Sequence, residues 1–244
     1  MKKLFLIGAG GHGKVVADIA EKMDCYETIC FLDDVRPSGE TCGKWKIVGT
    51  TQDGIQHDDG WEFFPAIGNA AARSKITERL EQNHLEIPLL IHPDASIAPD
   101  CKIGRGTVIM AGAVINSGSL IGKGVIINTC ASADHDNIIG DFSHVAVGAH
   151  LAGNVHLGRN VWVGIGAVVS NHLTIADDVV IGAGATVIRD LDEKGTYVGV
   201  PAERIKTGLH QMKYVEEVKH EGGVRPREGG KSLFFSMNSS EAAA

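Results

Sequence analysis

Residues 91–192, divided into units of six, read IHPDAS IAPDCK IGRGTV IMAGAV INSGSL IGKGVI INTCAS ADHDNI IGDFSH VAVGAH LAGNVH LGRNVW VGIGAV VSNHLT IADDVV IGAGAT VIRDLD. Every unit begins with Ile, Val or Leu, except the one that begins with Ala133, and the fifth residue is small or apolar in most units. Such a repeat outranks local propensity, because each unit buries its apolar face only by stacking on its neighbours. One large inward aliphatic in six residues indicates a short strand followed by a corner. Three units therefore form one coil, and the repeat predicts a parallel β-helix.

The composition indicates an ordinary cytoplasmic protein that binds neither nucleic acid nor membrane. The chain has 244 residues and a formal net charge of -7, and no run of Lys and Arg appears in it. Nucleic acid and anionic membranes are therefore not expected as partners. No stretch is long and apolar enough to span a bilayer. The 5 cysteines form no CxxC pair, which favours reduced thiols.

The pattern before the repeats is that of alternating strands and helices. Lys3–Ile7, Thr28–Leu32 and Trp61–Ile67 read as strands, and helical patterns follow the first and the last of them. This order predicts a small parallel sheet with crossover helices, which is a truncated Rossmann-like domain. The segment between Val35 and Gly60 is rich in Gly, Asp and Thr and is expected to be irregular.

The chain as a whole is expected to combine an α/β domain with an all-β domain. We place a Rossmann-like domain at residues 1–88, whose expected role in binding a nucleotide sugar is implied by the resemblance described below, and a β-helix domain at residues 89–206. Residues 207–244 lose the periodicity and mix Gly, Ser, Arg and Glu, so we expect a poorly ordered extension.

A glycine-rich turn follows the first strand. The pattern Gly8-x-Gly10-x-x-Gly13 matches a dinucleotide fingerprint, and Asp33 follows at the end of the next strand. Such a turn brings backbone N–H groups of a helix N-terminus close to a phosphate. A domain of this size lacks the second mononucleotide half that NAD requires, so the pattern favours a nucleotide diphosphate. His12 within the turn is interpreted as a phosphate or sugar contact, or else as an exposed turn residue.

The repeat is interrupted where Ala133 replaces the large aliphatic residue, and a polar run follows it. Local rules tend to be broken at functional sites. His135 is the natural general base there, since the ordinary histidine pKa of about 6.5 leaves it largely neutral near pH 7. A flanking carboxylate, that of Asp136 or of Asp134, would fix its tautomer through the other ring nitrogen.

Other histidines of the repeats raise the possibility of a metal site. His144, His150 and His156 occupy the same position in successive units, so they point to different faces of a three-sided coil. A single chain therefore does not gather them around Zn²⁺, although a site between subunits stays open. No metal is expected.

Several motifs together resemble one branch of the left-handed β-helix acyltransferases. The isoleucine-led hexapeptides end in a Gly-Val-Pro-Ala turn at Gly199–Ala202. The Gly-Ala-Gly-Gly-His-Gly turn at Gly8–Gly13, the Phe-Leu-Asp-Asp run ending at Asp34, and the segment Ile127–Val155 are similar to sugar acetyltransferases of the sialic-acid O-acetyltransferase and bacillosamine-pathway N-acetyltransferase type. The resemblance covers about residues 2–205, and the left-handed sense of the coil is implied by it alone.

The resemblance implies acetyl transfer from acetyl-CoA to an amino group of a nucleotide-linked sugar, of the 4-amino-4,6-dideoxysugar type, in a homotrimer with active sites between subunits. The residues it implies are His135 as base, Asp136 as its partner, the Gly153 N–H as oxyanion donor, and His144 near the thioester or acceptor. It further implies acceptor contacts at Gly10, His12, Asp33 and Asp34, and CoA contacts at Gly164, Ile165, Ala183, Val200 and Pro201. The setting would be surface-glycan biosynthesis.

Acid–base chemistry does not separate N- from O-acetylation, because a histidine base serves both. The nucleotide-type N-terminal domain favours the aminosugar, with sialic-acid-type O-acetylation as the alternative. Two other classes stay open: a metal-dependent hydratase on the same scaffold, and a non-catalytic nucleotide-sugar-binding protein.

Overall fold

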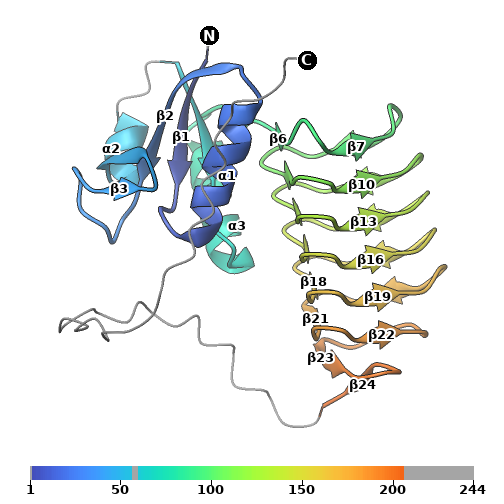
Figure 1. Cartoon of the computed structure of the whole chain (residues 1–244). Coiled ribbons are helices and arrows are strands. Elements are labelled where there is room, and N and C mark those ends of the chain that lie inside the picture. Colours follow the sequence, from blue (N-terminus) through green and yellow to red (C-terminus); the bar gives the residue numbers. More distant parts are fainter. Residues whose placement is uncertain (1, 57–59, 206–244) are drawn as a thin grey trace, which may run out of the picture. The chain divides into compact units, whose positions relative to one another are not determined.

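The computed structural model describes residues 2–56 and 60–205. It confirms a Rossmann-like domain followed by a parallel β-helix (Figure 1). The domain limits at residues 88 and 206 remain predictions, and the expected poorly ordered extension lies outside the described residues.

The N-terminal domain is a five-stranded sheet in the order β3-β4-β2-β1-β5, parallel except for the β3–β4 pair. Its strands are β1 (Lys2–Ile7), β2 (Tyr26–Leu32), β3 (Thr41–Cys42), β4 (Trp45–Gly49) and β5 (Trp61–Pro65). Its helices are α1 (Gly11–Lys22), α2 (Thr51–Gln56) and α3 (Ala70–Gln82). Helix α3 begins where the Asn69 side chain accepts the Ala72 N–H at 3.0 Å, which satisfies a donor that the helix leaves free.

The expectation that residues 35–60 are irregular was wrong. This segment contains the β3–β4 hairpin and helix α2. Strand β4 alternates between exposed and buried residues, and Ile47 at its centre is 1% exposed. The sequence pattern did not predict these short elements because turn-forming residues lie between them, such as Gly43, which has a φ of 64°.

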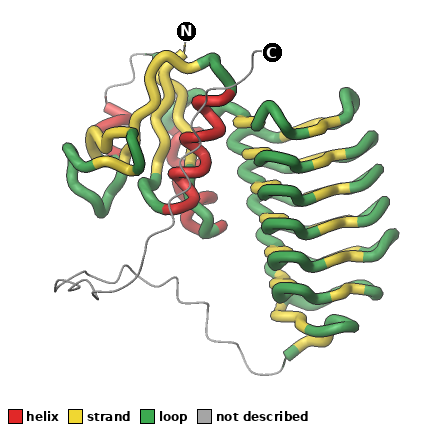
Figure 2. Tube along the Cα trace, viewed as in Figure 1, coloured by secondary structure: helices red, strands yellow, loops and turns green. Residues whose placement is uncertain are grey.

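The β-helix has three faces of short strands with corners between them, and the strands are parallel except for the last pair, which is antiparallel (Figures 1 and 2). Face 1 consists of β6 (Leu90–Ile91), β9 (Val108–Ile109), β12 (Ile126–Ile127), β15 (His144–Val145), β18 (Trp162–Val163), β21 (Val179–Ile181), β23 (Gly195–Val198) and β24 (Glu203–Arg204). Face 2 consists of β7 (Ser96–Ile97), β10 (Val114–Ile115), β13 (Ser132–Ala133), β16 (His150–Leu151), β19 (Val168–Val169) and β22 (Thr186–Val187). Face 3 consists of β8 (Lys102–Ile103), β11 (Leu120–Ile121), β14 (Ile138–Ile139), β17 (His156–Leu157) and β20 (Thr174–Ile175).

The interior of the coils is filled by the residues that begin each hexapeptide. Ile127, Val145 and Val163 are examples, and each is 0% exposed. Ala133 also points inward, in register between Ile115 and Leu151. The side chain at the interruption of the repeat thus still points inward, and only its size differs from that of the other units.

The outward residues of face 1 differ from those of the other two faces. Leu90, Val108 and Ile126 are buried and share one hydrophobic cluster with Val16 and Ala20 of α1. The corresponding residues of faces 2 and 3 are polar or exposed in most coils. Face 1 is therefore where the N-terminal domain packs on the β-helix. Among the helices in the described part of the chain, none is long and apolar enough to cross a membrane.

The inward and outward residues of a strand should differ in their contribution to stability. We expect Ile127→Ala, at a fully buried position, to lower the free energy of unfolding by about 2–5 kcal/mol because it leaves a cavity in the coil interior. Ile138→Ala removes the same atoms from a residue that is 41% exposed. This variant should change the free energy of unfolding by less than about 1 kcal/mol. Chemical denaturation of both variants tests this, and equal losses would contradict the inward assignment.

Candidate active site

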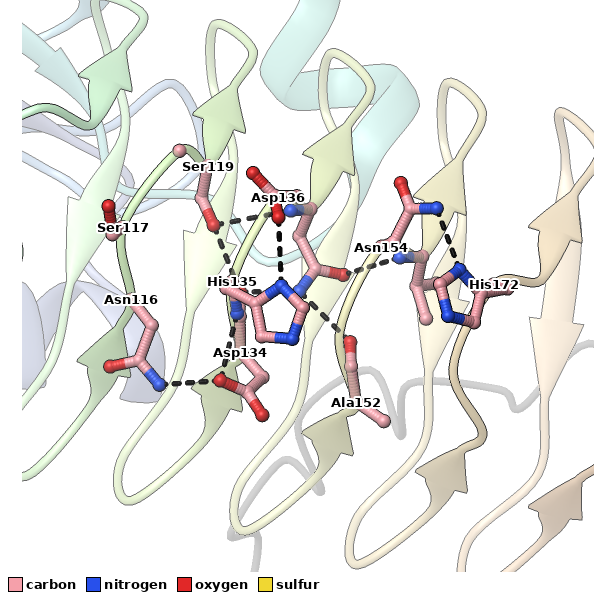
Figure 3. Close-up of polar contacts among 12 residues, drawn as sticks. Asn116, Ser117, Ser119, Asp134, His135, Asp136, Ala152, Asn154 and His172 are labelled. Carbon is pink, nitrogen blue, oxygen red and sulfur yellow. Dashed lines mark hydrogen bonds and ion pairs between the residues drawn. The ribbon is translucent and has the colours of Figure 1, made fainter.

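His135 lies in the corner between faces 2 and 3, which we call the His135 corner (residues 134–137) (Figure 3). Its Nδ1 is 2.8 Å from Asp136 Oδ2. The Asp134 carboxylate instead accepts the His135 backbone N–H at 2.8 Å and the Asn116 amide at 2.7 Å. Asp136 therefore orients the ring, and Asp134 holds the backbone of the corner. An Nδ1–H donated to Asp136 leaves the Nε2 lone pair free to accept a proton.

The charges around the ring make His135 a stronger base than an ordinary histidine. The hydrogen bond to Asp136 raises the pKa of His135, and the nearby negative charges of Asp134 and Asp136 add to the effect, while partial desolvation opposes it. The side chain is 57% exposed, so a substrate can reach it. The group is thus accessible and is fixed in one tautomer.

Gly153 lies in the next coil, directly against the imidazole. A Cβ at this position would be 2.4 Å from His135 Nε2, so a larger residue would displace the ring. The preceding Ala152 has no side-chain acceptor to cap the Gly153 N–H, whereas Asp134 caps the equivalent N–H of His135. Among the described residues the Gly153 N–H has no acceptor. The free backbone N–H of Gly153 therefore lies close to the free Nε2 of His135, in the corner of the next coil.

His12 and His144 lie together in the contact between the two domains, although they are far apart in the sequence. His144, on the outer side of face 1, is 6% exposed, and its ring lies 4.4 Å from that of Trp162. Burial lowers the pKa of His144 to about 3, with smaller contributions from the positive charge of Arg73 and from His12. Burial and Arg73 likewise lower the pKa of His12 to about 4. Both rings are therefore neutral, and each has a buried nitrogen without a partner among the described residues.

Arg73 of α3 holds this contact together. Its guanidinium donates to the backbone carbonyls of Gly124 and Phe142 in the β-helix, both at 2.7 Å. It also donates to the carbonyls of Ile67 and Gly68 after β5, at 2.9 and 2.8 Å. One side chain thus joins the end of β5 to the corner that precedes His144.

The remaining N-terminal site residues surround the glycine turn. Asp33 accepts the backbone N–H groups of Ala9 at 2.7 Å and of Val35 and Arg36 at 2.9 Å, so its carboxylate shapes the turn itself. Asp34 accepts the Thr51 N–H at the start of α2. At Gly10, the residue before α1, a Cβ would meet nothing within 4 Å, so this side of the turn is open.

The residues expected to contact CoA lie at a different edge of the coil. Gly164, Ile165 and Ala183 are in the corners between faces 1 and 2, where Ile165 is 60% exposed. Val200 is 75% exposed, in the turn that precedes β24, and Pro201 follows it. Face 2 therefore separates these residues from His135 within one chain, and the structure does not bring the two sets together.

A groove of about 440 Å³ crosses the outer side of face 2. Its lining consists of Val114, Asn116, Ser132, Asp134, His150, Leu151, Ala152, Val168 and Val169. Asp134 and Ala152 immediately precede His135 and Gly153, so the groove reaches the backbone of the His135 corner at one of its edges.

The histidines considered as metal ligands point to three faces, as the spacing predicts. His144, His150 and His156 belong to faces 1, 2 and 3. No group of three or more His, Cys, Asp or Glu side chains in the described ranges is arranged to hold a metal ion.

The structure also shows polar residues near the site that the sequence analysis did not select. Asn116 supports Asp134, and Asn154 Nδ2 lies 2.9 Å from His172 Nδ1 in the next coils (Figure 3). Asn137, inside the His135 corner, is 0% exposed. The sequence could have indicated Asn137, because it is a polar residue at the fifth position of its hexapeptide, where most units have a small or apolar residue.

Comparison with known proteins agrees with this description. Residues 3–80 match the PglD N-terminal domain, and residues 90–117 and 154–189 match the bacterial transferase hexapeptide family (six repeats). The acetyltransferase domain of PglB from Neisseria gonorrhoeae, solved in complex with acetyl coenzyme A, is 40% identical over 84% of this chain and 99% of that chain, with a TM-score of 0.80. A histidine-to-alanine mutant of GDP-perosamine N-acetyltransferase from Caulobacter crescentus, in complex with CoA and GDP-perosamine, is 32% identical over 85% of this chain and 98% of that chain, with a TM-score of 0.80.

Curated relatives match over shorter segments. The UDP-3-O-acylglucosamine N-acyltransferase of Delftia acidovorans is 38% identical over 73 residues, which are 27% of this chain and 22% of that protein. The chain spans between 20% and 33% of the length of the curated relatives it matches. Fold and site together define a left-handed β-helix acyltransferase. Within that class, the chain belongs to the hexapeptide-repeat sugar acetyltransferases with a PglD-type N-terminal domain, as the sequence motifs predicted.

The two carboxylates beside His135 should have different effects on its protonation. We expect Asp136→Asn to lower the pKa of His135, because the hydrogen bond that favours the charged ring is weakened. Asp134→Asn should lower it less, and NMR titration of the His135 ring compares the two. Asparagine tolerates the left-handed backbone of residue 136, which has a φ of 58°, so the corner should keep its shape. A larger shift in Asp134→Asn would show that Asp134 is the partner of the ring.

Proposed function

We propose that this protein transfers an acetyl group from acetyl-CoA to the amino group of a nucleotide-linked aminosugar, with His135 as general base. The observation that supports this most is the His135 imidazole, bonded through Nδ1 to Asp136 and packed against Gly153. The group that must take up a proton and a free backbone donor thus lie side by side in the corners of two successive coils. The setting we propose is surface-glycan biosynthesis in the cytoplasm.

The proposed reaction follows from these two groups. The acceptor nitrogen attacks the thioester carbonyl, and its proton passes to His135 Nε2. The Gly153 N–H donates to the oxygen that becomes negative in the tetrahedral intermediate. Collapse of the intermediate forms the amide, breaks the carbon–sulfur bond and releases CoA, whose thiolate can take the proton from the imidazolium.

An aminosugar carried by a nucleotide is favoured by the N-terminal domain. Its glycine turn offers an open helix N-terminus to a phosphate, and the neutral rings of His12 and His144 lie in the contact between the two domains. A relative of 32% identity binds GDP-perosamine, which supports the same acceptor class here. Which sugar and which nucleotide are bound is decided by the assay below.

We further propose a homotrimer with each active site between neighbouring subunits. The residues expected to hold CoA and the His135 corner lie at opposite edges of face 2. A second copy that packs along face 2 would bring its corner of Gly164, Ile165 and Ala183 beside His135. Oligomers of this kind are symmetric, so each of the three interfaces would form the same site.

Release of the CoA thiol tests the reaction. We expect acetyl-CoA to react with one member of a panel of UDP-, dTDP- and GDP-linked 4-amino-4,6-dideoxysugars, and the rate to fall about 10²- to 10⁴-fold in His135→Ala. His156→Ala, on exposed face 3, serves as the matched control and should retain the activity. Reaction only with free sialic acid would favour O-acetylation, and no reaction with any member would refute the proposed acceptor class.

Mixing two inactive variants tests the site between subunits. His135→Ala and Ile165→Glu should each lose most activity, since one removes the base and the other places a charge where CoA is expected to lie. In co-expressed mixed trimers about one quarter of the sites combine an intact His135 with an intact Ile165, so activity should return to roughly that fraction. No recovery in mixed oligomers would place the complete site within one chain.

A further inference from the structure

Some fifth residues of the hexapeptides are polar and lie inside the coils. Thr107, Ser119, Asn137 and Ser143 are all 0% exposed. Each donates to a carbonyl 15 positions later: Thr107 to Gly122, Ser119 to Asp134, Asn137 to Ala152, and Ser143 to Gly158. Each also accepts the N–H of the residue 18 positions later. These side chains therefore tie one coil to the next from within.

Asn137 makes one bond more than the hydroxyl residues can. Its Nδ2 donates to Ala152 O at 3.0 Å and also to Asp134 O at 2.6 Å, while its Oδ1 accepts the Val155 N–H at 3.2 Å. A hydroxyl group has a single proton to donate, whereas an amide nitrogen has two. Asn137 alone among these residues thus binds its own corner as well as the following one.

The two carbonyls that Asn137 holds belong to the residues immediately before His135 and Gly153. Ser119 reinforces the first of them, since its hydroxyl donates to Asp134 O at 3.0 Å and accepts the Asn137 N–H at 3.3 Å (Figure 3). The bonds continue in the backbone, where the Asn154 N–H donates to His135 O at 2.8 Å. Because Asn137 is fully buried, water does not replace its bonds when they are lost.

We propose that Asn137 is a positioning residue that fixes the His135 corner relative to the Gly153 N–H for acetyl transfer. The inference rests on the proposed function. The base and the oxyanion donor act on the same tetrahedral centre, so their separation sets the rate, and a misplacement of about 1 Å costs up to about 10²-fold. Asn137 acts through the backbone and touches neither substrate.

Thr107 offers a matched control. It occupies the same interior position at a corner between faces 3 and 1, and it makes the same pair of coil-to-coil bonds without lying beneath His135. Thr107→Val removes both of its bonds with little change of shape. Any loss that comes merely from a weakened coil interior will therefore appear in this variant as well.

The experiment compares Asn137→Ala, Asn137→Ser and Thr107→Val by steady-state kinetics and thermal unfolding. We expect kcat to fall about 10- to 100-fold in Asn137→Ala, with the KM values of both substrates within about twofold of the original protein. Asn137→Ser can restore the bond to Ala152, as Ser143 makes its own to Gly158, and should recover part of kcat. Thr107→Val should keep kcat even though its melting temperature falls. Unchanged kcat in both Asn137 variants, or an equal fall in Thr107→Val, would overturn the proposal.

A measurement without substrate separates this inference from the proposed function. Amide hydrogen exchange and NMR shifts of the His135 and Gly153 N–H groups should change in Asn137→Ser and stay as they are in Thr107→Val. If no acceptor is acetylated by the original protein, the proposed function fails and these signals still decide whether Asn137 fixes the corner. If Asn137→Ala does not fold, the kinetics and signals of Asn137→Ser decide, and signals that match those of the original protein would refute the role.

Discussion

The structure depends on the stacking of each coil on the next at an interval of 18 residues. Backbone pairs such as Ser132 with His150 keep this register along face 2, and backbone bonds join the corners as well, as from the Asn154 N–H to His135 O. A residue's neighbour in space is therefore fixed by its number, and the side-chain pairs of the site obey the same interval, as Asn116 with Asp134 shows. A single short strand of two residues has no stability of its own, so each coil depends on the coils above and below it.

This constraint explains how an exposed corner can hold a base in place. His135 projects toward solvent, yet the backbone of its corner is bonded to both neighbouring coils, through Asp136 N–H to Ser117 O and through His135 O to the Asn154 N–H. Its ring is held by Asp136 on one side and Gly153 on the other. For the reaction that we propose, preorganisation of this kind would place the proton acceptor and the oxyanion donor before the substrate arrives. Asn137 and Ser119 add hydrogen bonds to the same corner from inside the coil, where no substrate reaches.

The three faces of the β-helix differ in what packs on them, because their outward residues differ. Face 1 is apolar where α1 packs on it, and Arg73 closes the contact by binding carbonyls of both domains. His12 and His144 meet there because the two domains share one core, and burial keeps both rings neutral. Face 2 stays open and carries the groove that ends beside the His135 corner, which is consistent with a neighbouring subunit as its partner.

The sequence by itself determined the β-helix, because a period of six is repeated often enough to overrule local preferences. It also determined the strand–helix order of the first domain, and it indicated His135 as the base that we propose. It could not decide which acid orients His135, since Asp134 and Asp136 flank it symmetrically and only the left-handed backbone at residue 136 turns one carboxylate toward Nδ1. It also missed the hairpin within residues 35–60 and the role of Arg73 and Asn137. Arg73 and Asn137 each bond backbone groups that lie between 15 and 69 positions away in the chain, and only the tertiary structure brings such distant groups together.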